Sequence, residues 1–291
     1  MNFKNIFIVI VLYKTSLEDS KTIETLKSIP EESINLMVFD NSPVRQYVES
    51  HFQYDKFNIN YQHNGSNPGL SYAYNLALSE ASSLNIKWLL LLDQDTTITI
   101  EYIKEIINLK IEELSGDIVS IMPRVISLID DKIITPVKME LGGICRPILI
   151  PCGIVKKGIS GINSGTLLNV HFMNSIKGFS TNYSLDMLDH WYFREIKYKK
   201  KYIYLLQSFI KQDLSIYNNF EENISVSRYN QLLNAESLFI EEEGFLSLLV
   251  FRIRLFFRSL KQIKYKNNQY CKITLKEVFR LSQKNKKRVI K

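Results

Sequence analysis

Short apolar runs alternate with helical patterns through the first 130 residues of the chain. Strands are expected at residues 6–13, 35–40, 58–63, 87–93 and 117–126. The run at 6–13 is unbroken, which is typical of a strand that is covered on both faces. Helices are expected between the runs, at about 68–84 and 99–114. This alternation predicts an α/β fold, with a mainly parallel sheet enclosed by helices in three layers, α/β/α.

The first helix carries a local signal at its expected start. Thr15 and Glu18 match a capping box, in which side chains satisfy the backbone N–H groups of the first helical turn. The helix that follows would place Ile23, Leu26 and Ile29 along one side. The box therefore predicts a helix that begins at about residue 15.

Beyond residue 130 the pattern changes twice. Residues 130–158 are irregular and rich in Gly and Pro, so a loose segment that could hold a hairpin is expected there. Regular elements then return, including a strand at 202–209, and everything after about residue 217 looks helical. We therefore predict an α/β domain over 1–217 and a helical, basic extension over 218–291.

Composition narrows the class of protein. Hydrophobic residues make up 45% of the 291 and charged residues 23%, which excludes wholesale disorder. The three cysteines, Cys145, Cys152 and Cys271, form no CxxC pair, which excludes a disulfide scaffold and a cysteine zinc site. The apolar run near the N-terminus has no cleavage site after it, and no run is long enough to span a membrane. A cytoplasmic location is expected.

The charge of the chain is unevenly distributed. Residues 251–291 hold fourteen Lys or Arg and one acidic residue, a balance of +13, whereas the other 250 residues balance to −6. One helical face in this region is apolar and the opposite one basic: Phe245, Leu249, Phe256, Leu260 and Ile263 against Arg254, Arg258 and Lys261. Such a helix either packs on the rest of the protein or lies on an anionic membrane. No recognition motif points to nucleic acid.

Polar clusters follow three of the expected strands: Asp40-Asn41-Ser42, His63-Asn64-Gly65 and Asp93-Gln94-Asp95. Ligands of parallel sheets bind beyond the carboxyl ends of the strands. Asp93 and Asp95 offer the oxygen ligands that Mg²⁺ and Mn²⁺ prefer, although a short acidic turn can also simply end a strand. No glycine-rich phosphate loop is present, so a phosphate would be held mainly through a metal.

Several segments of the chain, these clusters included, resemble the motifs of a known enzyme family. The relevant motifs lie at residues 10–13, 38–42, 63–75, 91–95, 163–166, 178–179, 188–191, 213–215 and 227–229. In this order they are similar to the family 2 glycosyltransferases, and within these to the bacterial rhamnosyltransferase-like branch. The resemblance implies a nucleotide-sugar-binding, GT-A-like fold, inversion at the anomeric carbon, and a divalent metal, Mg²⁺ or Mn²⁺.

The resemblance also assigns roles to residues. It implies that Asp95 binds the metal and that Asp189 is the catalytic base. The expected nucleotide-sugar-binding residues are Tyr13, Asp40, Asn64, Gly65, Gly69, Asn75 and Asp93. Additional candidates are Asp186, His190 and Gln212. Each of these also has an ordinary explanation, such as a turn residue or a solvated helix position.

One position departs from the branch. A His commonly precedes its Asp/Asn-Leu-Ser element, whereas this chain has Gln212 before Asp213. A carboxamide is the weaker metal ligand, so metal binding is less secure than the two aspartates suggest.

The resemblance implies transfer of a hexose, with rhamnose as the first expectation, from a dTDP- or UDP-linked donor. The implied acceptor is a bacterial surface glycan or a lipid-linked glycan, which would place the protein in polysaccharide biosynthesis for the cell envelope. Two alternatives stay open: a nucleotidyltransferase-like metal enzyme, and a non-catalytic scaffold on the membrane. The enzyme would be cytoplasmic or peripheral on the inner face of the membrane.

Overall fold

The computed structural model describes residues 5–29, 33–110, 115–212 and 223–280. Its chain divides into two compact units. The first comprises Met1–Val137 and Pro147–Asp213, and the second comprises Lys138–Arg146 and Leu214–Lys291. The short segment Lys138–Arg146 was not expected in the second unit, because sequence position alone does not show which residues it contacts.

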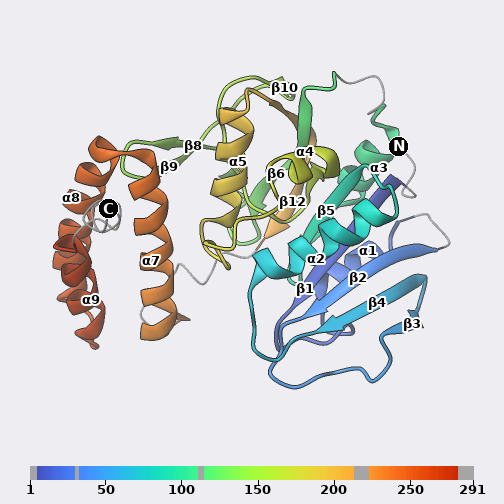
Figure 1. Ribbon diagram of the computed structural model, residues 1–291, viewed down its shortest axis with the longest axis horizontal. Coiled ribbons are helices and arrows are strands. Elements are labelled where there is room, and N and C mark those ends of the chain that lie inside the picture. The colour runs from blue at the N-terminus through green and yellow to red at the C-terminus, as the bar shows by residue number, and fades with distance from the viewer. Residues whose placement is uncertain (1–4, 30–32, 111–114, 213–222, 281–291) are drawn as a thin grey trace, which may run out of the picture. The chain divides into compact units, whose positions relative to one another are not determined.

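The first unit is built on one ten-stranded mixed sheet (Figure 1). Its strands are β1 (Ile6–Leu12), β2 (Ile34–Asp40), β3 (His51–Tyr54), β4 (Phe57–His63), β5 (Trp88–Asp93), β6 (Ile118–Ser127), β7 (Ile133–Thr135), β10 (Gly153–Val155), β11 (Thr166–Asn169) and β12 (Tyr202–Gln212). The order is β10-β12-β6-β11-β5-β1-β2-β4-β3, with β7 paired to β6. The strands β5, β1, β2 and β4 are parallel neighbours. All residues of β1 are buried, which explains its unbroken apolar run.

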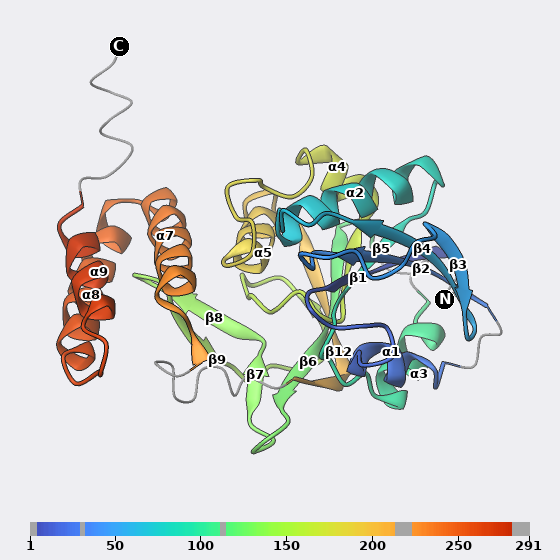
Figure 2. The ribbon, with the colours of Figure 1, turned by 90° about the horizontal axis from the view of Figure 1, so that it is seen from below.

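Helices cover both faces of this sheet. They are α1 (Lys21–Leu26), α2 (Leu70–Ser83), α3 (Ile100–Asn108), α4 (Val170–Ser175) and α5 (Leu188–Tyr198). Figure 2 shows α2 and α4 on one side of the sheet and α1 and α3 on the other. The predicted α/β/α architecture is therefore confirmed.

One local prediction for the first unit was wrong, and one strand was not predicted. The first helix begins at Lys21 with Ser20 as its N-cap, and the Ser20 side chain accepts from Ile23 N, so the capping box at Thr15 is not used. The strand β3 was not expected, because four residues that alternate between exposed and half-buried positions give a weak signal. It pairs antiparallel with β4 and forms the edge of the sheet.

In the described part of the chain, the second unit consists of three helices and most of a hairpin. They are α7 (Val226–Glu243), α8 (Phe245–Gln262), α9 (Gln269–Val278), β8 (Val137–Glu140) and β9 (Ile144–Pro147). Phe251 and Leu255 of α8 form part of its core. Arg258 of α8 makes a two-pronged ion pair with Glu236 of α7, at 2.7 and 3.2 Å. Among the described residues, no helix has both the length and the apolar character that a membrane span requires.

Candidate active site

The pairing of the parallel strands aligns their carboxyl ends. Leu12 of β1 pairs with Asp40 of β2, and Asp40 pairs in turn with His63 of β4. On the other side of β1, Val11 pairs with Asp93 of β5. The three polar clusters expected at strand ends therefore lie along one edge of the sheet, where ligands of such sheets bind.

Gln94, the residue between the two aspartates, links the loops at this edge by a hydrogen bond. Its Oε1 accepts from the backbone N–H of Tyr13 at 2.7 Å, so the carboxamide holds the loop after β1. The side chain of Tyr13 itself is 42% exposed at this edge. From the same loop, Lys14 N donates to Ser42 Oγ at 2.7 Å. Loops after β1, β2 and β5 are thus bonded to one another, and the position between the aspartates has a defined structural role.

Asp93 and Asp95 differ in environment. Asp93 is half-buried, and its backbone N–H donates to Ser164 Oγ at 3.1 Å. Burial, followed by the charge of Asp95, raises the pKa of the Asp93 carboxyl to about 7. Asp95 is exposed. An exposed carboxylate beside a partly buried one suits direct metal binding by Asp95, with Asp93 behind it.

Asp189 lies in the first turn of α5, where the helix dipole favours a negative charge. Its Oδ1 accepts from the backbone N–H of His190 at 2.7 Å. Burial raises the pKa of the Asp189 carboxyl, and the charge of Asp186, which lies before the start of α5 and so not on its face, acts in the same direction. The His190 ring is held separately, with Nδ1 2.6 Å from Ser160 Oγ. A raised pKa makes a carboxylate a stronger base for a proton.

The carboxyls of Asp93 and Asp189 interact, although they come from elements far apart in the sequence. The charge of Asp189 contributes to the raised pKa of Asp93. Two tyrosines that sequence reasoning missed belong to the same cluster: both carboxylates act on Tyr74 and on Tyr192, whose pKa values burial raises well above the ordinary value. No sequence signal marks these tyrosines, since each occupies an ordinary buried helix position.

Asp40 is completely buried, and both oxygens of its carboxylate already accept hydrogen bonds from neighbouring residues. Its Oδ1 accepts from Ser42 N at 2.8 Å, and its Oδ2 accepts from the Tyr61 hydroxyl at 2.6 Å. Gln46 Nε2 donates to the same Oδ2 at 3.1 Å. Gln46 is itself exposed and is the outermost of these groups. A nucleobase that reaches Asp40 would therefore have to take the place of the Gln46 side chain.

The segment 63–75 is held by internal contacts. The Asn64 carboxamide accepts from Ser66 N at 3.0 Å, which makes an ordinary turn. A Cβ on Gly65 would lie 2.9 Å from the Pro43 carbonyl, so this turn lies close to the loop after β2. Gly69 has φ +92°, and a Cβ there would clash with the Ser184 carbonyl.

Contacts of this segment also fix the position of the residues that precede Asp189. Leu70 N donates to the Ser184 carbonyl at 2.6 Å, so residue 184 covers the start of α2. Asn75 binds the backbone of Phe179 with both ends of its carboxamide, at 2.8 Å each. Gly69 and Asn75 therefore position the segment 178–184, which leads to Asp186 and Asp189.

The residues present fit a divalent metal of the Mg²⁺ or Mn²⁺ type. Gln212, at the end of β12, is buried and its Nε2 lies 3.4 Å from Asp93 Oδ2. Its Oε1 is buried and has no hydrogen-bond partner. Two carboxylates and one such carbonyl are oxygen donors, which these ions combine with water. No group of three His, Cys, Asp or Glu suited to a metal occurs among the described residues, and Asp213 lies outside them.

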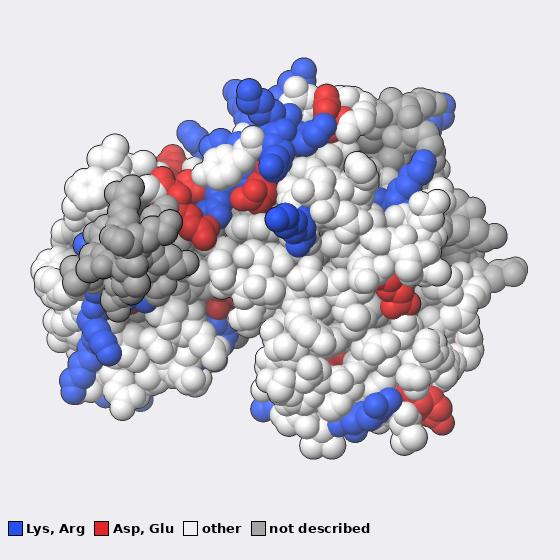
Figure 3. Space-filling model, in the orientation of Figure 1, with Lys and Arg blue, Asp and Glu red and all other residues white. Residues whose placement is uncertain are grey.

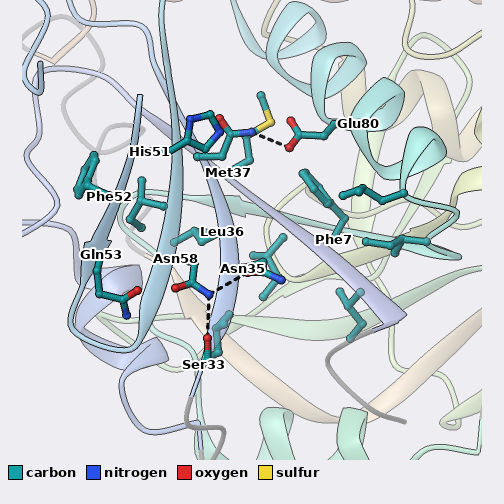
Figure 4. A pocket seen from close by; sticks show the side chains of 17 residues that line it. Phe7, Ser33, Asn35, Leu36, Met37, His51, Phe52, Gln53, Asn58 and Glu80 are labelled. Atoms are coloured by element: carbon teal, nitrogen blue, oxygen red, sulfur yellow. Dashed lines mark hydrogen bonds between the residues drawn. The ribbon is translucent and has the colours of Figure 1, made fainter. Parts of the chain in front are cut away.

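A cavity of about 440 Å³ lies at the opposite end of the strands (Figure 4). Residues at the amino ends of β1, β2 and β4 line it, including Phe7, Asn35 and Asn58. Asn58 Nδ2 donates to Ser33 Oγ at 2.8 Å and to Asn35 Oδ1 at 3.1 Å, so these polar groups satisfy one another. None of the expected site residues lines this cavity.

Comparisons with known proteins agree with this picture. Residues 7–136 match the family model described as Glycosyl transferase family 2. No curated protein matches the chain. The structure of GalNAc-T7 with UDP, GalNAc and Mn²⁺ aligns with TM-score 0.53 and 10% identity, covering 94% of this chain and 54% of that one.

Two further structures align over most of the chain. S. aureus TarS aligns with TM-score 0.48 and 12% identity, over 93% of this chain and 55% of that one. Mannosyltransferase PcManGT from Pyrobaculum calidifontis, in complex with GDP-Man and Mn²⁺, aligns with TM-score 0.48 and 9% identity, over 94% and 87%. The chain thus spans about half the length of TarS and of GalNAc-T7. Residues 7–136 are thus similar to the glycosyltransferases of family 2, and the chain has a GT-A-like fold.

Proposed function

We propose that the protein is an inverting, metal-dependent glycosyltransferase. The observation that carries this proposal is the placement of Asp93 at the carboxyl end of β5, beside the ends of β1 and β2, with Asp189 of α5 near enough for its charge to act on Asp93. Two carboxylates of different environment at the ligand-binding edge of the sheet can divide the work of metal binding and proton transfer.

Each residue has a defined part in this reaction. Asp189 takes the proton of an acceptor hydroxyl while the hydroxyl oxygen forms a bond to the anomeric carbon. The bond from that carbon to the donor phosphate breaks on the opposite face, and the nucleoside diphosphate leaves. Asp95, with Asp93 and Gln212 beside it, would hold the divalent ion, which neutralises the charge that develops on the departing phosphate.

The proposed donor is a dTDP- or UDP-linked hexose, with rhamnose as the first candidate. A carboxylate at Asp40 matches the N–H group of thymine or uracil. UDP is also the nucleotide in the GalNAc-T7 structure, which shares the fold. The proposed acceptor is a surface-glycan or lipid-linked precursor, and the proposed location is the inner face of the cell membrane, where the basic C-terminal helices would meet lipid.

Ligand-induced thermal shifts test this proposal. UDP- and dTDP-sugars are expected to raise the melting temperature of the protein when Mn²⁺ is present, and less when it is absent. Asp95→Asn should remove the metal-dependent part of the shift. Asp55→Asn, in the exposed turn between β3 and β4, is the matched control and should keep it. Absence of a shift with every nucleotide sugar would contradict the proposal.

A further inference from the structure

Helix α8 carries a continuous apolar stripe on its exposed side. Its members are between 43% and 78% exposed: Phe245, Leu246, Leu249, Ile253, Phe256, Phe257, Leu260 and Ile263. Large apolar side chains are common at a surface as single residues, but a stripe over the whole length of a helix marks an interaction surface. Figure 3 shows broad uncharged surface beside Lys and Arg on the visible face of this unit.

The packing of the second unit explains why this stripe is exposed. The opposite side of α8 provides the buried residues Phe251 and Leu255. It also buries Ser247, Ser259 and Gln262, and the Gln262 carboxamide donates to the buried Tyr229 hydroxyl at 3.0 Å. The more polar side of α8 is therefore held inside the unit by hydrogen bonds, and the more apolar side faces outward.

The positive charge around the stripe favours one kind of partner for it over another. Residues 245–276 contain eight Lys or Arg and no acidic residue. Arg258 is paired with Glu236, whereas Lys261, Lys264, Lys266 and Lys272 are exposed. A second copy of this chain would bring two such positive surfaces together, which is unfavourable, whereas anionic lipid is complementary to both the charge and the apolar stripe.

We propose that α8 docks the protein on an anionic bilayer. The stripe lies in the boundary between headgroups and acyl chains, and the lysines that flank it contact lipid phosphates. This identifies the surface for the membrane contact proposed above, and it does not depend on the transfer chemistry.

Vesicle sedimentation tests the proposal with the full-length protein. Binding is expected to vesicles of phosphatidylcholine mixed with phosphatidylglycerol, to be weak with phosphatidylcholine alone, and to fall as salt is added. Ile253→Glu with Phe257→Glu should weaken binding at least about tenfold, because each change places a charge in the apolar boundary. Leu149→Glu with Ile129→Glu is the matched control, since both residues are exposed and apolar and lie in the first unit.

A second pair of variants tests the charge. Lys261→Gln with Lys264→Gln should weaken binding to the anionic vesicles by about thirtyfold, and Lys104→Gln with Lys157→Gln should leave it unchanged. Binding that ignores the stripe variant, or that is equal on neutral vesicles, would overturn the proposal. So would a wild-type dimer in solution that the stripe variant abolishes. The UDP-induced thermal shift should persist in every variant, which separates failure of docking from failure of the proposed transferase activity.

Discussion

Replacing Gln46 by Ala tests whether Asp40 receives the base of the nucleotide. Gln46 Nε2 lies 3.1 Å from Asp40 Oδ2, 3.1 Å from the Thr15 carbonyl and 3.2 Å from Ser42 Oγ. Its amide thus offers N–H groups at the place where the N–H of a uracil or thymine would bind. Because Asp40 is buried beneath it, a base and the Gln46 side chain compete for one carboxylate oxygen.

The size of the effect follows from these contacts. A hydrogen bond to a charged group contributes roughly 1.5–3 kcal/mol to stability. Gln46 is exposed, so water competes for its amide, and its contribution falls below this range, at about 1 kcal/mol. Gln46→Ala should therefore lower the free energy of unfolding by about that amount. Since the base no longer displaces the amide, UDP affinity should rise by about fivefold.

Calorimetric titration with UDP and dTDP in the presence of Mn²⁺, together with urea unfolding, measures both quantities. Tyr61→Phe is the control, because the Tyr61 hydroxyl donates to the same oxygen from a buried position that a base cannot enter. It should cost more stability, roughly 1.5–3 kcal/mol, without raising affinity. Weaker UDP binding by Gln46→Ala would refute the reasoning and make Gln46 a nucleotide contact in its own right.

Three further predictions concern the carboxylates at the edge of the sheet. Asp95→Ala should abolish transfer and metal-dependent nucleotide binding with circular dichroism unchanged, and undiminished turnover would exclude the metal role. Asp189→Asn should lower the transfer rate at least about a hundredfold with donor affinity retained; a larger loss from Asp186→Asn would move the base to that residue. The pKa of the Asp93 carboxyl is about 7 in the folded state, against 3.8 as the ordinary value of an unfolded chain, so this carboxyl stays protonated to a higher pH when the protein is folded. The free energy of unfolding of the metal-free protein should therefore fall as the pH rises from about 4 to about 7. In urea unfolding across this range, Asp93→Asn should gain stability relative to wild type as the pH rises, and a constant difference would contradict the raised pKa.

Local patterns were enough to predict the framework of the first unit. The apolar runs that became β1 and β5 are buried along nearly their whole length, so their hydrophobicity alone marked them as central strands. The polar residues at the ends of β2 and β5 were recognisable for the same reason, since each ends a buried run, whereas β4 alternates between buried and more exposed positions. Parallel pairing then places these ends on one edge, whatever the loops do.

Contacts between distant parts of the chain decided the rest of the candidate site. Gly69 looks like a turn residue, but the Ser184 carbonyl leaves no room for a side chain there. Asn75 and Phe179 bond across 104 residues, and Gln46 covers Asp40 from a loop with no motif. Tyr74 joins the carboxylates only because α2 lies on the sheet beside them. Such pairs leave no trace in local periodicity, because each partner alone has an ordinary spacing.

The second unit shows the same division between sequence and tertiary structure. Its sequence determined that α8 is a basic helix with an apolar face, since both follow from spacing and composition. An apolar face is ordinarily the one that packs inward. Here the core of the unit formed around Phe251, Leu255 and a hydrogen-bonded set of Tyr229, Gln262 and Thr274. Only that packing decided which side of the helix is exposed, because burial of one face depends on partners that the helix itself does not contain.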